Sequence, residues 1–193
     1  MVILYFFSIY LNISRKKIKD HHNYGKISLA DLLKKSSNVG AIKLGLDVDP
    51  EDMHDLFSRV GFGEIVGTGF PGEGSGILPS HKKSMQLERA NFAIGYSLNA
   101  SALQIAQAYA VLASDGLKKP LTLLKLDKPP EGEQVVNAEL VAKVRKMMVG
   151  VAQPGGTAVD AAIYTYDVAG KTGTSHKNTV GGYEEKRYVS LFA

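Results

Sequence analysis

The chain has 193 residues, 45% of them hydrophobic, and carries a formal net charge of +4 from 23 basic and 19 acidic residues. This length and composition indicate one globular domain with a sizeable core and exclude a disordered or collagen-like polymer. The basic residues are scattered without interleaved aromatic residues, so no nucleic-acid partner is expected. The sequence contains no cysteine, which excludes disulfides and cysteine-ligated metals, and we expect neither a cofactor nor a metal.

Residues 1–17 form an apolar and basic leader, in which the run from Val2 to Leu11 is followed by Arg15-Lys16-Lys17. The run is too short to span a membrane as a helix, because a spanning helix needs about 20 apolar residues. A secretory signal carries its positive charge before the apolar region, whereas here the charge follows it. We therefore leave residues 1–17 unassigned, with a foreign start or a surface strand as alternatives, and predict one domain over residues 18–193.

Capping signals predict several helices along this domain. Ser28 with Asp31 forms a capping box before a helix that leads to Ser36, and residues 39–46 form the next apolar helical run. Asp49-Pro50 is a strong start for a third helix. Glycine and proline are then frequent over residues 61–80, which predicts a long ordered loop.

The second half of the domain contains further helical patterns over residues 87–96 and 101–114, and after Asn137. On the helix of residues 101–114 the apolar spacing predicts a core face made by Leu103, Ala106, Ala110 and Ala113. On the helix after Asn137 the predicted core stripe is Leu140, Val141, Val144, Met147, Met148 and Val151. Residues 117–128 are predicted to be extended, and Thr157 is predicted to cap a short helical run to Ile163.

The stretch from Val168 to Ser175 predicts a strand that carries chemistry. Gly170 and Gly173 lack a Cβ, so another backbone can approach closely. Lys171 supplies a charge between them, and Thr172 and Thr174 share one face because side chains alternate along a strand. Residues 187–192 are rich in strand formers and are predicted to pair with this strand as an antiparallel hairpin.

The same stretch has two simpler interpretations. A nucleotide phosphate loop requires a glycine five residues before Gly170, and Thr165 occupies that position, so this interpretation is rejected. An ordinary edge strand with a solvated lysine remains an alternative when these residues are taken alone.

A second motif, Ser36-Ser37-Asn38, lies in the predicted turn between the first two helices, where a serine and an asparagine could also be simple helix caps. Ser-x-Asn together with Lys-Thr-Gly at Lys171-Thr172-Gly173 is typical of penicillin-recognising serine enzymes. The chain resembles the transpeptidase domain of class B penicillin-binding proteins, in particular the enzymes that build septal peptidoglycan during cell division. The resemblance implies a partial α+β transpeptidase fold, with a mostly helical lobe and an antiparallel hairpin.

The resemblance also implies a function and a location. It implies acyl transfer on peptidoglycan stem peptides that end in D-Ala-D-Ala, recognition of β-lactams, and divisome partners at the periplasmic face of the bacterial inner membrane in a full-length parent. It gives the proton relay and amide roles to Ser36 and Asn38. It gives substrate binding to the Lys171 strand, whose members are Lys171, Thr172, Gly173 and Thr174.

The family's acylated serine belongs to a Ser-x-x-Lys pair, and upstream of Ser36 only Ser14-Arg15-Lys16-Lys17 has this spacing. This stretch is close to Ser36 and lies among charges, so a solvated basic turn is the favoured interpretation. We therefore expect a transpeptidase fragment that is truncated at both ends and inactive alone. The alternatives are a non-catalytic module that binds peptide stems or divisome proteins, and a related serine β-lactamase or carboxypeptidase.

Overall fold

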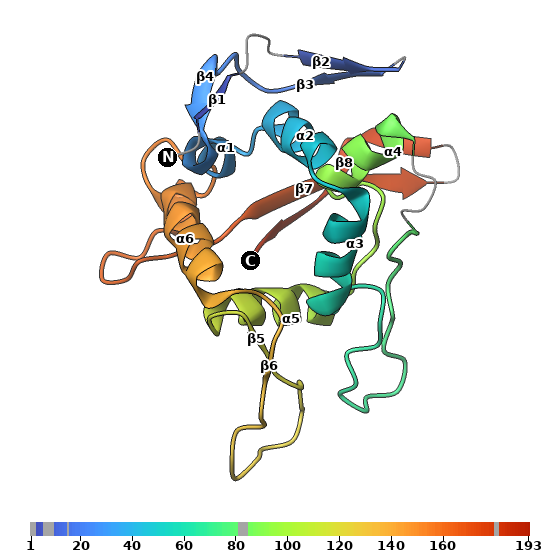
Figure 1. The fold of residues 1–193 in the computed structure, drawn as a ribbon, viewed down its shortest axis with the longest axis vertical. Coiled ribbons are helices and arrows are strands. Elements are labelled where there is room, and N and C mark those ends of the chain that lie inside the picture. Colours follow the sequence, from blue (N-terminus) through green and yellow to red (C-terminus); the bar gives the residue numbers. More distant parts are fainter. Residues whose placement is uncertain (1–2, 6–9, 15, 81–84, 180–181) are drawn as a thin grey trace.

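The structure, a computed structural model, describes residues 3–5, 10–14, 16–80, 85–179 and 182–193. It has a mixed architecture in which helices hold more of the described residues than strands do, and the strands form small antiparallel pairs (Figure 1). The helices are α1 (Leu29–Lys35), α2 (Asn38–Asp47), α3 (Pro50–Arg59), α4 (Gln86–Ala93), α5 (Ala102–Ala113) and α6 (Ala138–Val149), with 3₁₀ turns η1 (Gly150–Ala152) and η2 (Val159–Ala161). The strands are β1 (Ile3–Tyr5), β2 (Tyr10–Ile13), β3 (Lys16–Lys19), β4 (Lys26–Ser28), β5 (Leu117–Lys118), β6 (Glu133–Gln134), β7 (Thr172–Thr179) and β8 (Gly182–Phe192).

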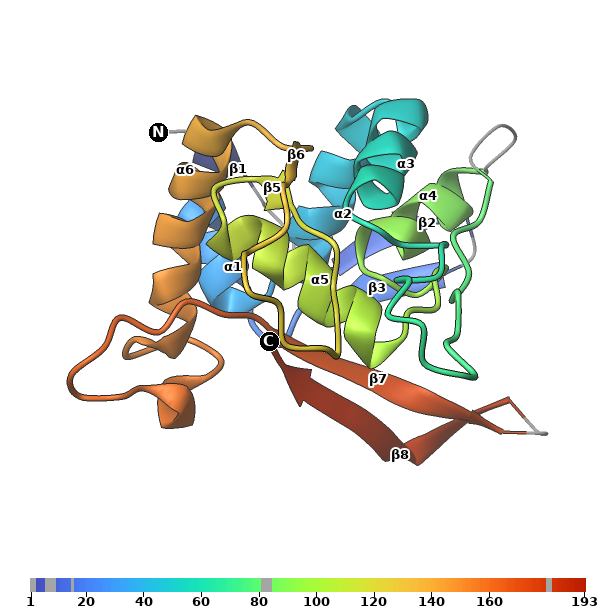
Figure 2. The same ribbon diagram turned by 90° about the horizontal axis from the view of Figure 1, so that it is seen from below.

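The strands pair as β1–β4, β2–β3, β5–β6 and β7–β8, and every pair is antiparallel. The longest pair is the β7–β8 hairpin, which runs along one side of the helices and brings Thr172 opposite Phe192 (Figure 2). The predicted α+β class, with a helical lobe and an antiparallel hairpin, is therefore confirmed.

The helix starts follow the capping signals of the sequence. At the start of α1, Ser28 Oγ accepts a hydrogen bond from Asp31 N at 3.1 Å, and Asp31 Oδ2 accepts one from Ser28 N at 3.2 Å. At the start of α6, Asn137 Oδ1 accepts hydrogen bonds from Glu139 N and Leu140 N. These side chains satisfy amide groups that have no partner inside a helix, which is why both helices begin where local sequence predicts.

Helix α2 lies at the centre of the core. Its residues Val39 and Ile42 are both 0% exposed and belong to two adjoining clusters of buried apolar side chains. Helix α4 packs closely on α2, because a Cβ added at Gly45 would lie 2.5 Å from Ala93 Cβ. Only glycine permits this approach, which fixes α4 next to the helix that begins at Asn38.

The predicted core face of α5 is wrong. Leu103, Ala106, Ala110 and Ala113 are exposed, whereas Gln104, Gln107 and Val111 are buried. The Gln104 amide explains its own burial, since its Nε2 donates to the carbonyl oxygens of Glu64 and Ser75, both at 2.8 Å. The predicted stripe after Asn137 is only partly buried: Val141, Met148 and Val151 are buried, whereas Leu140 is 55% exposed.

Three further expectations require correction. The extended stretch of residues 117–128 forms a strand only at Leu117–Lys118, and the remainder is a loop that leads to β6. Thr157 does not cap a helix, because η2 begins at Val159 and has Ala158 in the capping position. The predicted strand from Val168 begins at Thr172, although Lys171 N still donates to Ala193 O at 2.8 Å. No helix in the described ranges has the length and apolar character that crossing a membrane requires.

Candidate functional site

The turn between α1 and α2 places Ser36 in an uncommon backbone conformation. Ser36 is the C-cap of α1 with φ 53° and ψ 48°, in the left-handed region, and its N–H donates to Leu33 O at 3.2 Å. A residue with a Cβ costs about 1–2 kcal/mol in this region relative to glycine. The serine is therefore held there by the surrounding structure, which is a pattern that recurs at functional sites.

Ser37 and Asp20 fix the other half of the turn. Ser37 is the N-cap of α2, and its Oγ accepts from Gly40 N at 2.9 Å and donates to Asp20 Oδ2 at 2.6 Å. Asp20 Oδ1 also accepts from Val39 N at 3.1 Å, and both Asp20 and Ser37 are buried. The capping role thus belongs to Ser37, which leaves the Ser36 hydroxyl and the Asn38 amide available at the surface of the turn.

Lys171 reaches this turn from the opposite end of the sequence. Its Nζ donates to Ser36 Oγ at 2.6 Å and to Thr172 O at 3.0 Å. The residue before it is buried Gly170, where an added Cβ would clash with the Phe192 ring. The predicted approach of Ser36 and Lys171 across 135 residues is confirmed.

Burial changes the charge equilibrium of Lys171. Desolvation of the ammonium group lowers the pKa of Lys171 from its ordinary value. A lowered pKa increases the fraction of neutral amine at physiological pH, and only the neutral amine can accept a proton from a hydroxyl.

A cleft of about 370 Å³ is lined by every site residue that the sequence predicts. The turn contributes Ser36 and Asn38, and the strand contributes Lys171, Thr172, Gly173 and Thr174. The cleft is also lined by Ala93, Ile94 and Tyr96 at the end of α4, which sequence reasoning missed. These residues belong to an ordinary apolar helix pattern, so no local signal could identify them.

The strand side chains differ in their surroundings. Thr172 Oγ1 and Thr157 Oγ1 lie 2.8 Å apart in a hydrogen bond, which joins the loop before η2 to the cleft. Thr174 and Asn38 are exposed, and Gly173 pairs with Leu191 in the hairpin. The cleft therefore offers a cation, hydroxyls, an amide and a strand edge, which suit a peptide with a terminal carboxylate.

Among the residues that the structure describes, no member of the chain's two Ser-x-x-Lys stretches lines this cleft. Ser14 is exposed in the turn between β2 and β3, while Arg15 lies outside the described residues. Sequence reasoning passed over the same spacing at Ser80-His81-Lys82-Lys83, downstream of the Ser-x-Asn motif. Ser80 lines a different cavity, and residues 81–84 are not among those that the structure describes.

Two substitutions of Ser36 measure the energetic cost of its left-handed backbone conformation. Ser36→Gly and Ser36→Ala both remove the hydroxyl, but only glycine adopts a positive φ without penalty. We expect the glycine variant to exceed the alanine variant in unfolding free energy by about 1 kcal/mol. Urea titrations of both variants measure this difference, and equal stability would show that the left-handed conformation is not retained.

Known proteins resemble the chain over nearly its whole length. Residues 9–193 match the family model for the penicillin binding protein transpeptidase domain. Peptidoglycan D,D-transpeptidase FtsI of Escherichia coli K12 is 40% identical over 181 residues, which are 94% of this chain and 31% of FtsI. The probable peptidoglycan D,D-transpeptidase PenA of Neisseria flavescens is 38% identical over 175 residues, which are 91% of this chain and 44% of PenA.

A solved structure has the same fold. The apo transpeptidase domain of penicillin-binding protein 3 from Burkholderia pseudomallei aligns with a TM-score of 0.93 and 33% identity. The alignment covers 99% of this chain and 58% of the Burkholderia chain. The chain thus spans less than half of these two curated relatives and somewhat more than half of this solved domain.

Proposed function

Because the chain belongs to the penicillin-binding protein transpeptidase domain family, we propose that it is the part of a peptidoglycan D,D-transpeptidase that holds the proton relay and the substrate-binding strand. The observation that carries this proposal is the 2.6 Å contact between Lys171 Nζ and Ser36 Oγ. It joins two motifs that are distant in sequence inside one cleft, and a proton relay requires contact of this length.

The relay consists of Ser36 and Lys171. The neutral amine of Lys171, whose fraction increases as burial lowers the pKa, accepts a proton from Ser36 Oγ, and the serine in turn exchanges a proton with the reacting group. Asn38 supplies an amide that holds the substrate backbone. An ammonium form of Lys171, together with Thr172 and Thr174, binds the terminal carboxylate of the substrate.

The substrate is a peptidoglycan stem peptide that ends in D-Ala-D-Ala, and β-lactams compete for the same cleft. The peptide adds to the edge of β7 by main-chain hydrogen bonds. Gly173 allows the Leu191 side chain of the paired strand to pack closely, since an added Cβ would lie 3.2 Å from Leu191 Cγ. In a full-length parent this reaction belongs to septal wall synthesis, with divisome proteins as partners, at the periplasmic face of the inner membrane.

Acylation requires a further group, because within the described residues no Ser-x-x-Lys pair lies beside the cleft. The chain alone therefore binds substrate reversibly and does not turn it over. The missing step is attack by an activated serine on the carbonyl of the penultimate D-alanine, with release of the terminal D-alanine.

Reversible binding of a stem-peptide analogue tests the proposal. We expect diacetyl-Lys-D-Ala-D-Ala to bind the folded chain weakly. Lys171→Met should raise the dissociation constant of this peptide about tenfold, since a charge-assisted contact is lost. Ligand-observed NMR titration gives the dissociation constant. Lys125→Met is the matched control and should have no effect, because Lys125 is exposed in a loop and does not line the cleft.

The same titration has a predicted pH dependence. Binding of the carboxylate needs the ammonium form, so affinity should fall as the pH rises through the lowered pKa of Lys171. The fall should occur below the range of an ordinary lysine, about pH 10.4, and should disappear in Lys171→Met. Undiminished affinity in the Lys171 variant would remove this residue from the site.

A further inference from the structure

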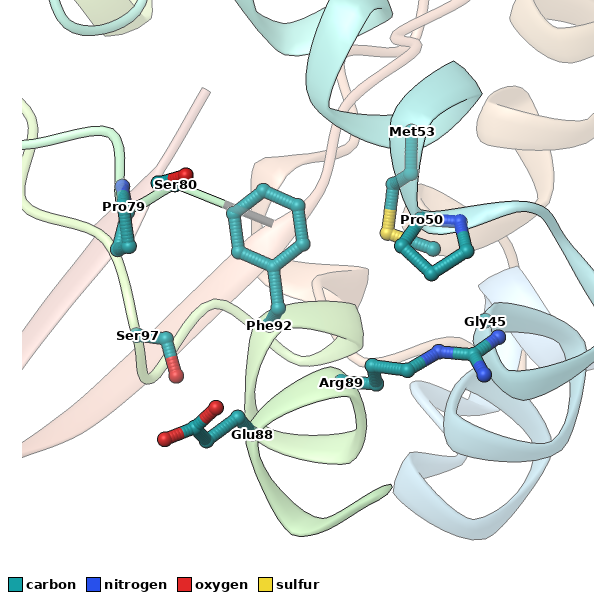
Figure 3. A pocket seen from close by; sticks show the side chains of 9 residues that line it. All are labelled: Gly45, Pro50, Met53, Pro79, Ser80, Glu88, Arg89, Phe92 and Ser97. Carbon is teal, nitrogen blue, oxygen red and sulfur yellow. The ribbon is translucent and has the colours of Figure 1, made fainter. Parts of the chain in front are cut away.

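The excess positive charge of the chain is concentrated in the stretch RKKIK, which runs from Arg15 to Lys19. Four of the 23 basic residues lie there, and the 19 others equal the 19 acidic residues in number, so this stretch accounts for the whole formal net charge of +4. Its described residues line neither the cleft around Lys171 nor the cavity around Phe92 that Figure 3 shows. The charge therefore has no part in the proposed function.

Most of this stretch is strand β3, which pairs with β2 in a hairpin that lies beyond α2 in Figure 1. Leu11 lies opposite Ile18 in the register, and both pack against one of the two buried apolar clusters. Side chains alternate along a strand, so the other side of the hairpin faces solvent. This basic face consists of Tyr10, Asn12, Lys17 and Lys19, all of which are exposed. The core thus holds the two strands that present the basic face.

The hairpin contains no carboxylate that offsets these charges. The first acidic residue after it, Asp20, is buried and accepts from Ser37 Oγ and Val39 N. The lysines of β3 form no ion pair with any residue that the structure describes. Positive charges this close together repel one another, and an anion from outside the chain relieves that repulsion.

Tyr10 adds an amphipathic ring to the basic face. It lies opposite Lys19 in the register, and Lys17 Nζ is 3.9 Å from the centroid of its ring. This cation–π contact keeps the Lys17 ammonium beside the ring. A tyrosine suits the boundary between lipid headgroups and acyl chains, because the body of its ring is apolar and its hydroxyl is polar.

The shape of the basic face distinguishes between kinds of polyanion. Neighbouring strands present their side chains on a nearly flat surface, which fits the plane of a bilayer. Single-stranded nucleic acid is bound through several aromatic side chains along a groove, whereas the basic face has one aromatic residue. Each lysine near an anionic membrane surface strengthens binding about fivefold, so a few lysines produce a measurable affinity.

We propose that the basic face of the β2–β3 hairpin docks on the surface of an anionic phospholipid bilayer. Lys17 and Lys19 lie against the headgroup phosphates, and the Tyr10 ring lies at the level of the headgroups. This inference does not depend on the proposed transpeptidase function, because the basic face and the cleft around Lys171 use different residues.

Sedimentation of the folded chain with large vesicles tests the proposal. We expect vesicles with about 30% phosphatidylglycerol in phosphatidylcholine to bind the chain at least tenfold more strongly than phosphatidylcholine alone. Most of this difference should be lost in about 0.5 M sodium chloride, because salt screens exposed charges. Absence of binding, equal binding to neutral vesicles, or equally tight binding of a single-stranded oligonucleotide would overturn the proposal.

Two double variants locate the contact. Lys17→Gln with Lys19→Gln should weaken vesicle binding about twentyfold, since two charges leave the basic face. Lys125→Gln with Lys128→Gln removes the same charge from exposed positions between β5 and β6, and should weaken binding by less than about threefold. Equal losses in both would show that net charge, and not this face, binds lipid. Thermal unfolding and sedimentation without vesicles confirm that each variant is folded and does not pellet alone.

A tryptophan reporter gives an independent measurement, because the chain contains no tryptophan. The emission of Tyr10→Trp should shift to the blue when phosphatidylglycerol vesicles are added, since the ring enters less polar surroundings. Tyr164→Trp, at a side chain that is 104% exposed in the loop before β7, should show no shift. A shift in Tyr164→Trp without one in Tyr10→Trp would place the lipid contact on another surface and overturn the proposal.

Discussion

A fluorescent penicillin will leave no stable acyl adduct on the folded chain. Acylation needs an oxygen nucleophile with an adjacent base. Loss of either the nucleophile or its base lowers the reaction rate by about four to six powers of ten. Ser36 does not have the spacing of the acylated serine, because position 39 is Val39, and its contact with Lys171 is assigned to the proton relay. Denaturing gels and intact mass measure the adduct, with a complete D,D-transpeptidase as the positive control.

An adduct would identify its own nucleophile. Loss of the adduct in Ser36→Ala would make Ser36 the acylated residue and contradict its relay role. Loss in Ser14→Ala would instead assign the nucleophile to the stretch from Ser14 to Lys17, and Ser80→Ala tests the remaining Ser-x-x-Lys spacing in the same way.

Asp20→Ala will produce a large loss of stability, because one buried carboxylate accepts two hydrogen bonds at the start of α2. The substitution leaves Ser37 Oγ and Val39 N without their buried acceptor, and hydrogen bonds to a charged group contribute about 1.5–3 kcal/mol each. We expect the unfolding free energy to fall by about 3 kcal/mol, since the backbone amide can recover part of its loss through water. Urea titration with an unchanged denaturant slope measures this effect.

The matched control is Asp47→Ala at the exposed last turn of α2. It removes a carboxylate of the same size that caps nothing, so its effect should stay within about 0.5 kcal/mol. A loss below 1 kcal/mol in Asp20→Ala would mean that the turn bearing Ser36 does not depend on this carboxylate. Asp20→Asn keeps one acceptor oxygen and should lie between the two.

Local chemistry made much of the fold predictable. Ser28 and Asn137 cap their helices through bonds to residues two or three positions away, so a short window of sequence contains the whole interaction. The hairpin was likewise predictable from strand formers on either side of a turn. The cleft was predictable because both motifs had to meet one substrate, and the contact between Ser36 and Lys171 agrees with this expectation.

The failed expectations involve partners that are distant in sequence. The apolar period on α5 predicts burial of Leu103, yet Gln104 is 0% exposed because carbonyl groups of the loop over residues 61–75 need a donor. Thr157 bonds Thr172 instead of a helix terminus. The pairing of Ser37 with Asp20 also joins residues distant in sequence. Hydrophobic periodicity reflects only local spacing, so it predicts none of these hydrogen bonds.

The separation of Ser36 and Lys171 has a kinetic consequence. Their hydrogen bond closes a loop of 135 residues, and closing such a loop costs about 4 kcal/mol of chain entropy before the contact contributes anything. The short α1–α2 unit can form early from neighbouring residues, whereas the cleft has to wait for the rest of the fold. A partly folded intermediate would thus contain the helices but neither the relay contact nor the buried Lys171, and the chemistry of the cleft belongs only to the fully folded state.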